Sequence, residues 1–183
     1  MDGKRPTELR TDRLRLRRVQ FADFDAIHAI MSDAETMQFW STPPHSTLAE
    51  TEKWFASMIE ADRARKSDEF VLEHSGVVIG KLGAWRLPEI GFYLRRDFWG
   101  NGLATEALLR FISYAEDMGQ DCLTADVDPR NTACLRLLAK CGFHETGRQS
   151  ATYLVDGQAC DSVYLKLDLF PPRIQPRPFP QTA

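Results

Sequence analysis

The sequence predicts an α+β protein in which a mixed, mostly antiparallel sheet carries helices on both faces. Segments with the two-residue period of strands and the 3.6-residue period of helices follow one another without strict βαβ alternation. Thr47 and Glu50 form a T-x-x-E capping box in front of an amphipathic stretch, which predicts a helix start. The dipeptides Ser75-Gly76 and Asp156-Gly157 separate strand-like segments and are typical of tight hairpin turns.

The N-terminal half is expected to contain one strand and two helices. Apolar and charged residues alternate from Glu8 to Val19, which predicts a strand. A helical face over Ala22–Met31 follows, and Pro43-Pro44 separates it from the helix that begins after Thr47. The buried stripe of this second helix is expected to be Leu48, Thr51, Trp54, Phe55, Met58 and Ile59.

The remainder of the chain is expected to supply most of the sheet. Strands are predicted at Glu69–Glu73, Val77–Trp85, Glu89–Leu94 and Leu123–Val127. Helices are predicted from Asn101 to Met118 and over Thr132–Lys140. The last predicted element is a hairpin in which Tyr153–Leu154 and Val163–Leu169 flank the turn at Asp156-Gly157.

Composition indicates one globular domain. The chain has 183 residues, 43% hydrophobic and 27% charged, which is enough for a sizeable core. A formal net charge of -3 argues against a general nucleic-acid binder, which would carry a basic excess. The N-terminus has no apolar signal-peptide region, and no run of about 18 apolar residues occurs. We therefore expect no membrane segment and a cytoplasmic location.

Cysteine spacing and domain limits complete this picture. The four cysteines include no CxxC pair and the four histidines are scattered, so we expect reduced thiols and no metal site. The domain is expected to span residues 8–169, as a monomer or a homodimer. Residues 170–183 are expected to form a proline-rich tail.

The most informative stretch is the loop between the strand that ends at Leu94 and the helix that follows. It carries Gly100, Gly102 and Ala104, whose small side chains let a backbone approach an anion closely. The free N–H groups of a helix's first turn bind phosphate, so the loop predicts diphosphate recognition.

Three interpretations of this loop compete. A Rossmann site would place its first glycine directly after the strand, whereas about five residues intervene here, and Thr105 stands at the third small position. Asp126 could serve as the distal acid of such a site. A flexible helix entry without a ligand also remains open. The GxxxxGK[ST] phosphate-loop pattern is absent.

The loop also resembles a known family motif. The segment Trp99-Gly-Asn-Gly-Leu-Ala104 is similar to motif A of GNAT acetyltransferases, [QR]-x-x-G-x-[GA], with Trp in place of Gln or Arg. Its W-G-x-G-x-A-T-E-A form resembles the RimJ/RimL-type branch, the ribosomal-protein N-acetyltransferases and their relatives. Thr11–Arg17 and Asn131–Phe143 are similar to two further segments of that branch. The resemblance covers about residues 8 to 169 in the family's order.

The resemblance implies a GNAT (acyl-CoA N-acyltransferase) fold and an N-acetyltransferase. Acetyl-CoA would be the cosubstrate, with no metal, and the acceptor would be a primary amine that attacks directly in a ternary complex. That amine would belong to a protein N-terminus, a small amine or an amino acid. The pyrophosphate would bind along Trp99, Gly100, Asn101, Gly102, Leu103, Ala104 and Thr105, chiefly through backbone amides.

Two further cofactor contacts follow from the resemblance. Leu94 would pair its backbone with the pantetheine arm and direct an N–H to the thioester carbonyl, where the strand splays in this family. Asn131 would hydrogen-bond the cofactor arm. A helix N-cap before Thr132 is an equally good interpretation of Asn131, and one residue can serve both roles.

The catalytic acid and base are less clearly indicated. Many GNAT enzymes place a Tyr where this chain has Leu138, which cannot donate a proton. The RimJ/RimL-type pattern has Ser at the position of Cys134, and a thiol can also donate a proton to the leaving thiolate. Packing and covalent acyl transfer are the alternatives for Cys134. Glu89 is the candidate base; a water chain, or a merely exposed carboxylate, is the alternative.

Three function classes remain at this point. A working N-acetyltransferase is the first, and its acceptor side would include the loop Met37–Pro44 with Phe39 and Trp40, unless these rings belong to the core. A non-catalytic acyl-CoA-binding or interaction module with a decayed site is the second, favoured by Leu138 and Cys134. A nucleotide-dependent dehydrogenase is the third, and it would bind NAD and not CoA.

Overall fold

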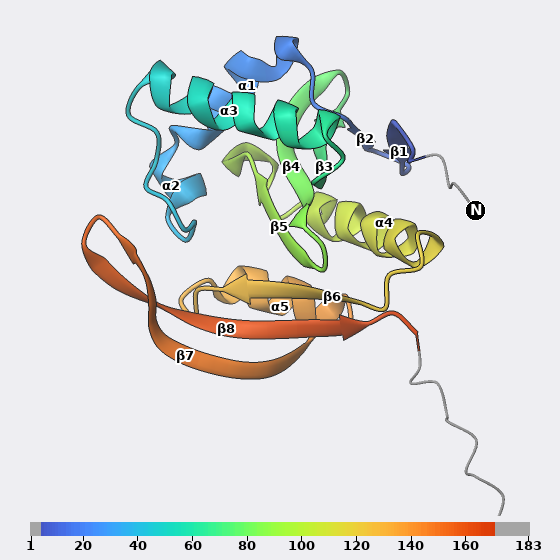
Figure 1. The fold of residues 1–183 in the computed structure, drawn as a ribbon, viewed down its shortest axis with the longest axis vertical. Coiled ribbons are helices and arrows are strands. Elements are labelled where there is room, and N and C mark those ends of the chain that lie inside the picture. The colour runs from blue at the N-terminus through green and yellow to red at the C-terminus, as the bar shows by residue number, and fades with distance from the viewer. Residues whose placement is uncertain (1–4, 171–183) are drawn as a thin grey trace, which may run out of the picture.

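A single eight-stranded sheet in the order β1-β2-β3-β4-β5-β6-β8-β7 organises the computed structural model, which describes residues 5–170 (Figure 1). Its strands are β1 (Glu8–Arg10), β2 (Arg15–Arg17), β3 (Asp68–His74), β4 (Val77–Arg86), β5 (Glu89–Leu94), β6 (Cys122–Val127), β7 (His144–Val155) and β8 (Gln158–Asp168). The helices are α1 (Phe24–Met31), α2 (Ala34–Met37), α3 (Leu48–Arg63), α4 (Leu103–Asp117) and α5 (Thr132–Lys140). Short 3-10 turns lie at Phe21–Asp23 and Arg96–Phe98.

The sheet is mixed and mostly antiparallel, as predicted. β5 and β6 run parallel, while the other paired strands are antiparallel. This arrangement is not the doubly wound parallel sheet of a Rossmann fold, so the dehydrogenase interpretation is wrong. The glycine loop also follows a 3-10 turn after β5 and does not begin directly at the end of the strand.

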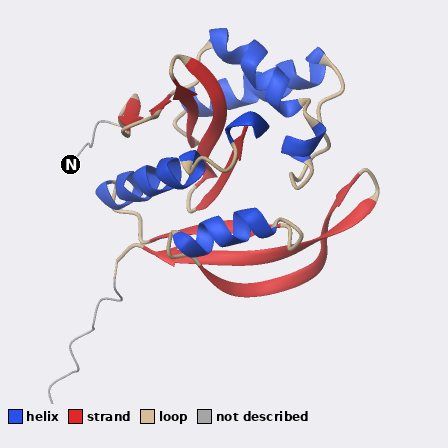
Figure 2. Cartoon of the chain, turned by 180° about the vertical axis from the view of Figure 1, so that it is seen from behind, coloured by secondary structure: helices blue, strands red, loops and turns tan. Residues whose placement is uncertain are grey.

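Helices cover both faces of the sheet and create two cores. α4 and α5 lie on one face, where Phe111, Leu108 and Leu138 pack against inward residues from β1 to β6 and β8. α1 and α3 lie on the other face, where Ile27 and Phe55 pack against strands β3 to β5. Figure 2 shows α5 lying across the strands of the C-terminal half, which lack α1 and α3 on their opposite face. The fold prediction is therefore confirmed.

Several elements begin and end as their local signals predicted. β5 and α5 have the predicted limits. The capping box of α3 is formed, because the Thr47 hydroxyl accepts from the Glu50 amide and the Glu50 carboxylate accepts from the Thr47 amide. The predicted stripe of α3 is half-buried or buried except at Leu48, which is 55% exposed. Leu48 is the first residue of the helix and lies beyond the edge of the core.

The N-terminal strand prediction was wrong in one respect. Residues 8–17 form a hairpin of two short strands, β1 and β2, and not one strand. The Leu14 amide donates to the Thr11 hydroxyl (2.9 Å), and the Thr11 amide donates to the Leu14 carbonyl (3.0 Å), which closes the turn. Alternation of apolar and polar residues continues through this turn, so periodicity alone could not reveal it. The four-residue helix α2, capped by Asp33, was also not predicted.

The C-terminal hairpin is much longer than predicted. β7 spans 12 residues and β8 spans 11, joined by Asp156 and Gly157 at φ 49° and 77°. β7 is an edge strand with mostly exposed residues, so it has no alternating pattern to detect. Of the predicted tail, only Phe170 lies within the described residues.

Gly157→Val should destabilise the protein without changing its ligand binding. Valine at φ 77° is strained by about 1–3 kcal/mol, because the left-handed region disfavours β-branched residues. No atom lies within 4 Å of a Cβ added there, so the expected effect is backbone strain alone. Thermal unfolding should show a lower Tm, and titration calorimetry should show an unchanged Kd for CoA. A weaker Kd at unchanged Tm would place this turn in the binding site.

Candidate active site

β5 and β6 separate along β5, before the glycine loop begins, and this separation positions the site. Their register pair is Glu89 with Thr124, near the start of both strands, and the Thr124 amide donates to the Pro88 carbonyl (2.9 Å). Beyond this pair the strands diverge toward Leu94 (Figure 1). A cavity of about 400 Å³ lies at this divergence.

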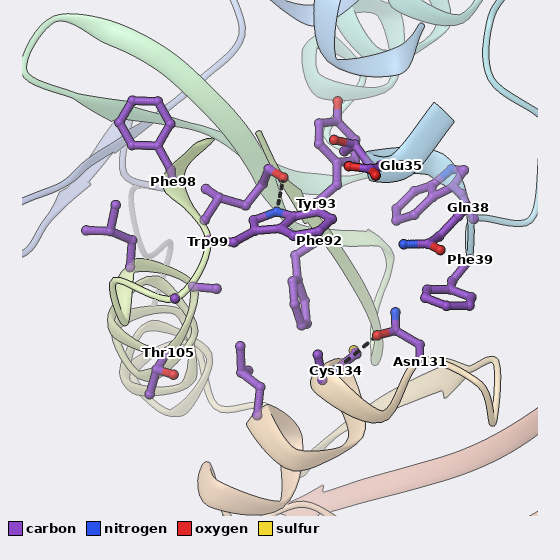
Figure 3. Close-up of a pocket in the computed structure, with 18 of the residues that line it drawn as sticks. Glu35, Gln38, Phe39, Phe92, Tyr93, Phe98, Trp99, Thr105, Asn131 and Cys134 are labelled. Carbon is purple, nitrogen blue, oxygen red and sulfur yellow. Dashed lines mark hydrogen bonds between the residues drawn. The ribbon is translucent and has the colours of Figure 1, made fainter. Parts of the chain in front are cut away.

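Three groups of residues line the cavity (Figure 3). The first comes from α2 and the loop after it: Glu35, Thr36, Gln38, Phe39 and Trp40. The second is the end of β5 with the glycine loop and the start of α4: Phe92, Tyr93, Leu94, Phe98, Trp99, Gly100, Gly102, Leu103, Ala104 and Thr105. The third belongs to α5 and its cap: Asn131, Ala133, Cys134 and Leu137. Most of the predicted cofactor residues therefore meet in one cavity.

The backbone of Leu94 points into the gap between the strands. Leu94 is paired with Gly80 of β4, and the Arg95 amide donates to the Ile79 carbonyl (2.7 Å). In an antiparallel ladder this bond flanks a non-hydrogen-bonded pair, so the N–H and C=O of Leu94 face away from β4. The carbonyl accepts the indole N–H of Trp99 (2.6 Å; dashed in Figure 3). The amide remains directed toward the gap.

The glycine loop leaves open space where an anion would bind. Gly102 is the N-cap of α4 at φ 76°, and Gly100 has φ 74°. No atom lies within 4 Å of a Cβ added to Gly100, and a Cβ on Gly102 would meet one atom, Nη2 of Arg13, at 3.7 Å. The free amides of the first turn of α4 face this space, so the loop fits a diphosphate.

Arg13 and Glu106 support this loop, although the sequence analysis did not single them out. Glu106, in the first turn of α4, accepts from the Arg13 amide (3.0 Å) and from Arg13 Nε (2.7 Å). Arg13 Nη1 also donates to the carbonyl of Asn101 (2.9 Å). The β1–β2 turn therefore fixes both the loop and the helix start. Two sequence signals touched these residues: Arg13 lies in the segment similar to the family's opening strand, and Glu106 is the Glu of the W-G-x-G-x-A-T-E-A form.

Asn131 and Cys134 lie together at the start of α5. The Cys134 amide donates to Oδ1 of Asn131 (3.0 Å), so Asn131 is a helix N-cap, as one interpretation predicted. The cap does not use the side-chain amide nitrogen of Asn131, and Asn131 also lines the cavity (Figure 3). This nitrogen could therefore also bind the cofactor, and that role stays a prediction. Burial raises the pKa of the Cys134 thiol to about 12, so this thiol is protonated at neutral pH. Leu138 is fully buried in the core.

The other predicted residues lie around the cavity in different ways. Glu89 is half-buried, does not line the cavity, and accepts from the Trp85 indole N–H at 3.4 Å. Trp40 lines the cavity and also packs edge-on against Tyr93 at 5.4 Å in the core, so its contact with the acceptor stays a prediction. Phe39 lines the cavity and receives the guanidinium of Arg130 at 6.0 Å from its ring centre.

Three other features bear on the chemistry of the molecule. All four cysteines are free. Within residues 5–170, no three His, Cys, Asp or Glu side chains gather into a metal-binding group. None of the helices in the described part of the chain has the length and hydrophobicity needed to cross a membrane.

Comparisons with known proteins agree with this geometry. Residues 13–144 match the model of the family described as "Acetyltransferase (GNAT) domain". An L-methionine sulfoximine/L-methionine sulfone acetyltransferase of Pseudomonas aeruginosa is 30% identical over 169 residues, covering 85% of this chain and 94% of that protein.

Two solved structures share the fold. One is a spermidine N-acetyltransferase from Vibrio cholerae in complex with CoA and spermine, with a TM-score of 0.74 and 20% identity over 87% of this chain and 97% of that one. The other is an acetyltransferase from Salmonella typhimurium that modifies the N-terminal serine of the ribosomal protein L7/L12. Its TM-score is 0.77 and its identity 17%, over 86% of this chain and 96% of that one.

Proposed function

The chain belongs to the acetyltransferase (GNAT) domain family and is an acetyl-CoA-dependent N-acetyltransferase, and from this we propose that it acetylates a primary amine by direct attack in a ternary complex. The amine belongs to a small molecule, an amino acid or a protein N-terminus. The observation that carries the proposal is one cavity in which the anion-binding loop, the outward-facing backbone of Leu94 and the thiol of Cys134 meet.

The cofactor is proposed to run from the loop into the strand gap. The amides from Gly100 to Thr105 bind the pyrophosphate, helped by the dipole of α4. Phe92 and Leu94 alternate with residues hydrogen-bonded to β4, so both backbones face the gap and pair with the pantetheine arm. The free amide nitrogen of Asn131 donates to the same arm from the α5 side.

The residues around the reacting atoms have three roles in this proposal. The Leu94 N–H donates to the thioester carbonyl and stabilises the negative charge that develops on its oxygen. The amine nitrogen forms its bond to the carbonyl carbon, the carbon–sulfur bond breaks, and the Cys134 thiol donates a hydrogen bond to the departing sulfur. A carboxylate near the gap takes the amine proton, and Glu89 is the residue to which the sequence points.

The acceptor is proposed to enter from the side of α2. Phe39 and Trp40 supply an apolar wall there, and Glu35 and Gln38 add polar groups at the same side of the cavity. The related proteins act on an amino-acid analogue, a polyamine and an N-terminal serine, and these three acceptor types define the first candidates. The free cysteines suit a reducing compartment, and we place the enzyme in the cytosol.

A mixed-acceptor assay tests the proposal. The purified protein is incubated with acetyl-CoA and with spermidine, L-methionine sulfone or a peptide that begins with serine, and products are identified by mass spectrometry. We expect a mass gain of one acetyl group on at least one amine and release of free CoA thiol. Tight CoA binding without any acetylated amine would instead support the non-catalytic binding module.

A further inference from the structure

A second carboxylate lies at the point where β5 and β6 separate. The parallel pair of Glu89 and Thr124 fixes the register, so two residues farther along each strand Asp126 is level with Gly91. Side chains two residues apart share a face, so Asp126 lies on the same face of the sheet as Glu89 and Tyr93. Glu89 and Thr124 form the register pair between β5 and β6, so on the β5 side Asp126 borders the gap, while on its other side it is paired with Tyr164 of β8.

The wall opposite Asp126 is the acceptor side of the cavity. Gly91 has no side chain, and Trp40 covers it closely enough that an added Cβ would lie 3.4 Å from the ring. Trp40 lines the cavity beside Phe39. Arg130, four residues after Asp126, contacts Phe39 and so brings the end of β6 to the same wall. Asp126 itself is exposed, so an acceptor can reach it.

The position of Asp126 is supported from β8 and β7. Ser162, which is 1% exposed, lies near this carboxylate and favours its charged form. The Ser162 hydroxyl in turn shares a hydrogen bond with the Thr152 hydroxyl (2.7 Å). Two hydrogen-bonded hydroxyl groups of β8 and β7 therefore lie on the side of Asp126 away from β5.

The pKa of Asp126 is shifted in the opposite direction to that of Asp128, the next carboxylate along the chain. Desolvation and the nearby charge of Glu89 raise the pKa of Asp126, although Ser162 acts to lower it. Asp128, two residues later, has a lowered pKa because Arg130 binds it. Among the residues that the structure describes, no lysine or arginine forms an ion pair with Asp126. The titratable groups that face it are Glu89 on β5, Tyr164 on β8 and Tyr153 on β7.

We propose that Asp126 is the catalytic carboxylate that receives the proton of the acceptor amine, beside Glu89. The inference rests on the proposed acetyl transfer and makes its proton route specific. The carboxylate binds the ammonium form and takes one proton, which leaves a free amine to attack. Asp126, which is exposed, releases this proton to solvent. As the carbon–nitrogen bond forms and the carbon–sulfur bond breaks, the nitrogen loses its second proton to Asp126, and the thiolate takes a proton from solvent. The products are the amide and free CoA.

The geometry favours Asp126 over Glu89 for this step. Glu89 lies at the level where β5 and β6 are still paired, and its carboxylate accepts a hydrogen bond from the Trp85 indole N–H. Asp126 lies farther toward the end of β5, where Leu94 directs its amide into the gap. In this arrangement Glu89 acts on Asp126 through its charge, which makes it a positioning residue.

The test compares Asp126→Asn and Glu89→Gln with the wild-type enzyme, using the acceptor among spermidine, L-methionine sulfone and a serine peptide that is acetylated fastest. Asp126→Asn should lower kcat about 100-fold, leave KM for acetyl-CoA unchanged and remove the acidic limb of the pH–rate profile. Asp126→Glu should restore part of the rate. Glu89→Gln should move the acidic limb to lower pH, because a like charge is lost. Asp121→Asn, the same change just before β6, is the control and should match wild type.

Two outcomes would overturn the inference. One is an Asp126→Asn enzyme within threefold of wild type with the same acidic limb. The other is a large loss of kcat in Glu89→Gln without one in Asp126→Asn. Carboxylate ¹³C NMR of the CoA complex separates this inference from the proposed function. If no amine is acetylated, the proposed acetyl transfer is refuted. If none of the three amines shifts the carboxylate signal of Asp126, the contact between Asp126 and the amine is refuted as well.

Discussion

Gly102→Val is expected to weaken acetyl-CoA binding about 100-fold, equivalent to about 2.7 kcal/mol. The new side chain would project into the space above the first turn of α4, where the atom nearest to an added Cβ is Nη2 of Arg13 at 3.7 Å. It would hold the pyrophosphate away from the amides and remove charge-assisted hydrogen bonds, each contributing about 1.5–3 kcal/mol. Titration calorimetry with CoA measures the effect directly.

Backbone strain needs its own control in this experiment, because Gly102 has φ 76°. Gly119 provides it: the residue has φ 73°, has no atom within 4 Å of an added Cβ, and follows the opposite end of the same helix. Gly119→Val should lose similar stability in thermal unfolding and keep the wild-type Kd for CoA. Equal affinities for a folded Gly102→Val protein and the control would refute the assignment of the cofactor loop.

Cys134→Ala is expected to lower kcat by about 10- to 100-fold, at the low end of general-acid contributions. A thiol with a pKa of about 12 is protonated at neutral pH, so it is always available as a donor. Full transfer of its proton to a CoA thiolate of ordinary pKa, about 8.5, is unfavourable, because the pKa of the Cys134 thiol is the higher of the two. Cys134 should therefore stabilise the leaving sulfur by a hydrogen bond, and KM for acetyl-CoA should barely change.

Comparison of two substitutions separates the possible roles of Cys134. Cys134→Ser should keep much of the rate, because a hydroxyl also donates a hydrogen bond. If the side chain only packs, Ala and Ser should both keep the wild-type kcat, and Ser should lower stability more by burying a hydroxyl. Cys122→Ala, a partly exposed cysteine on β6, is the matched control. An acetylated Cys134 found by mass spectrometry without amine would reveal a covalent route, against which the raised thiol pKa argues.

Short-range signals made much of this protein predictable. The capping box at Thr47 and Glu50, the turn at Asp156-Gly157 and the limits of α5 depend on residues only a few positions apart. The glycine loop belongs with them, since small residues before a helix leave room around the amides of its first turn. These interactions form within single elements, so they can be predicted from the sequence without knowing what packs around those elements.

Interactions between residues far apart in the sequence became apparent only in the tertiary structure. The bonds from Arg13 to Glu106 span 93 residues and attach the β1–β2 turn, which the sequence pattern hid, to the cofactor loop. The separation of β5 from β6 likewise depends on how whole strands pair, and it leaves Asp126 at the edge of the gap between them. The sequence by itself determined the local elements and the open glycine loop, because their interactions lie within a few residues. The tertiary structure determined which distant side chains surround that loop, because this depends on the pairing and packing of the whole sheet.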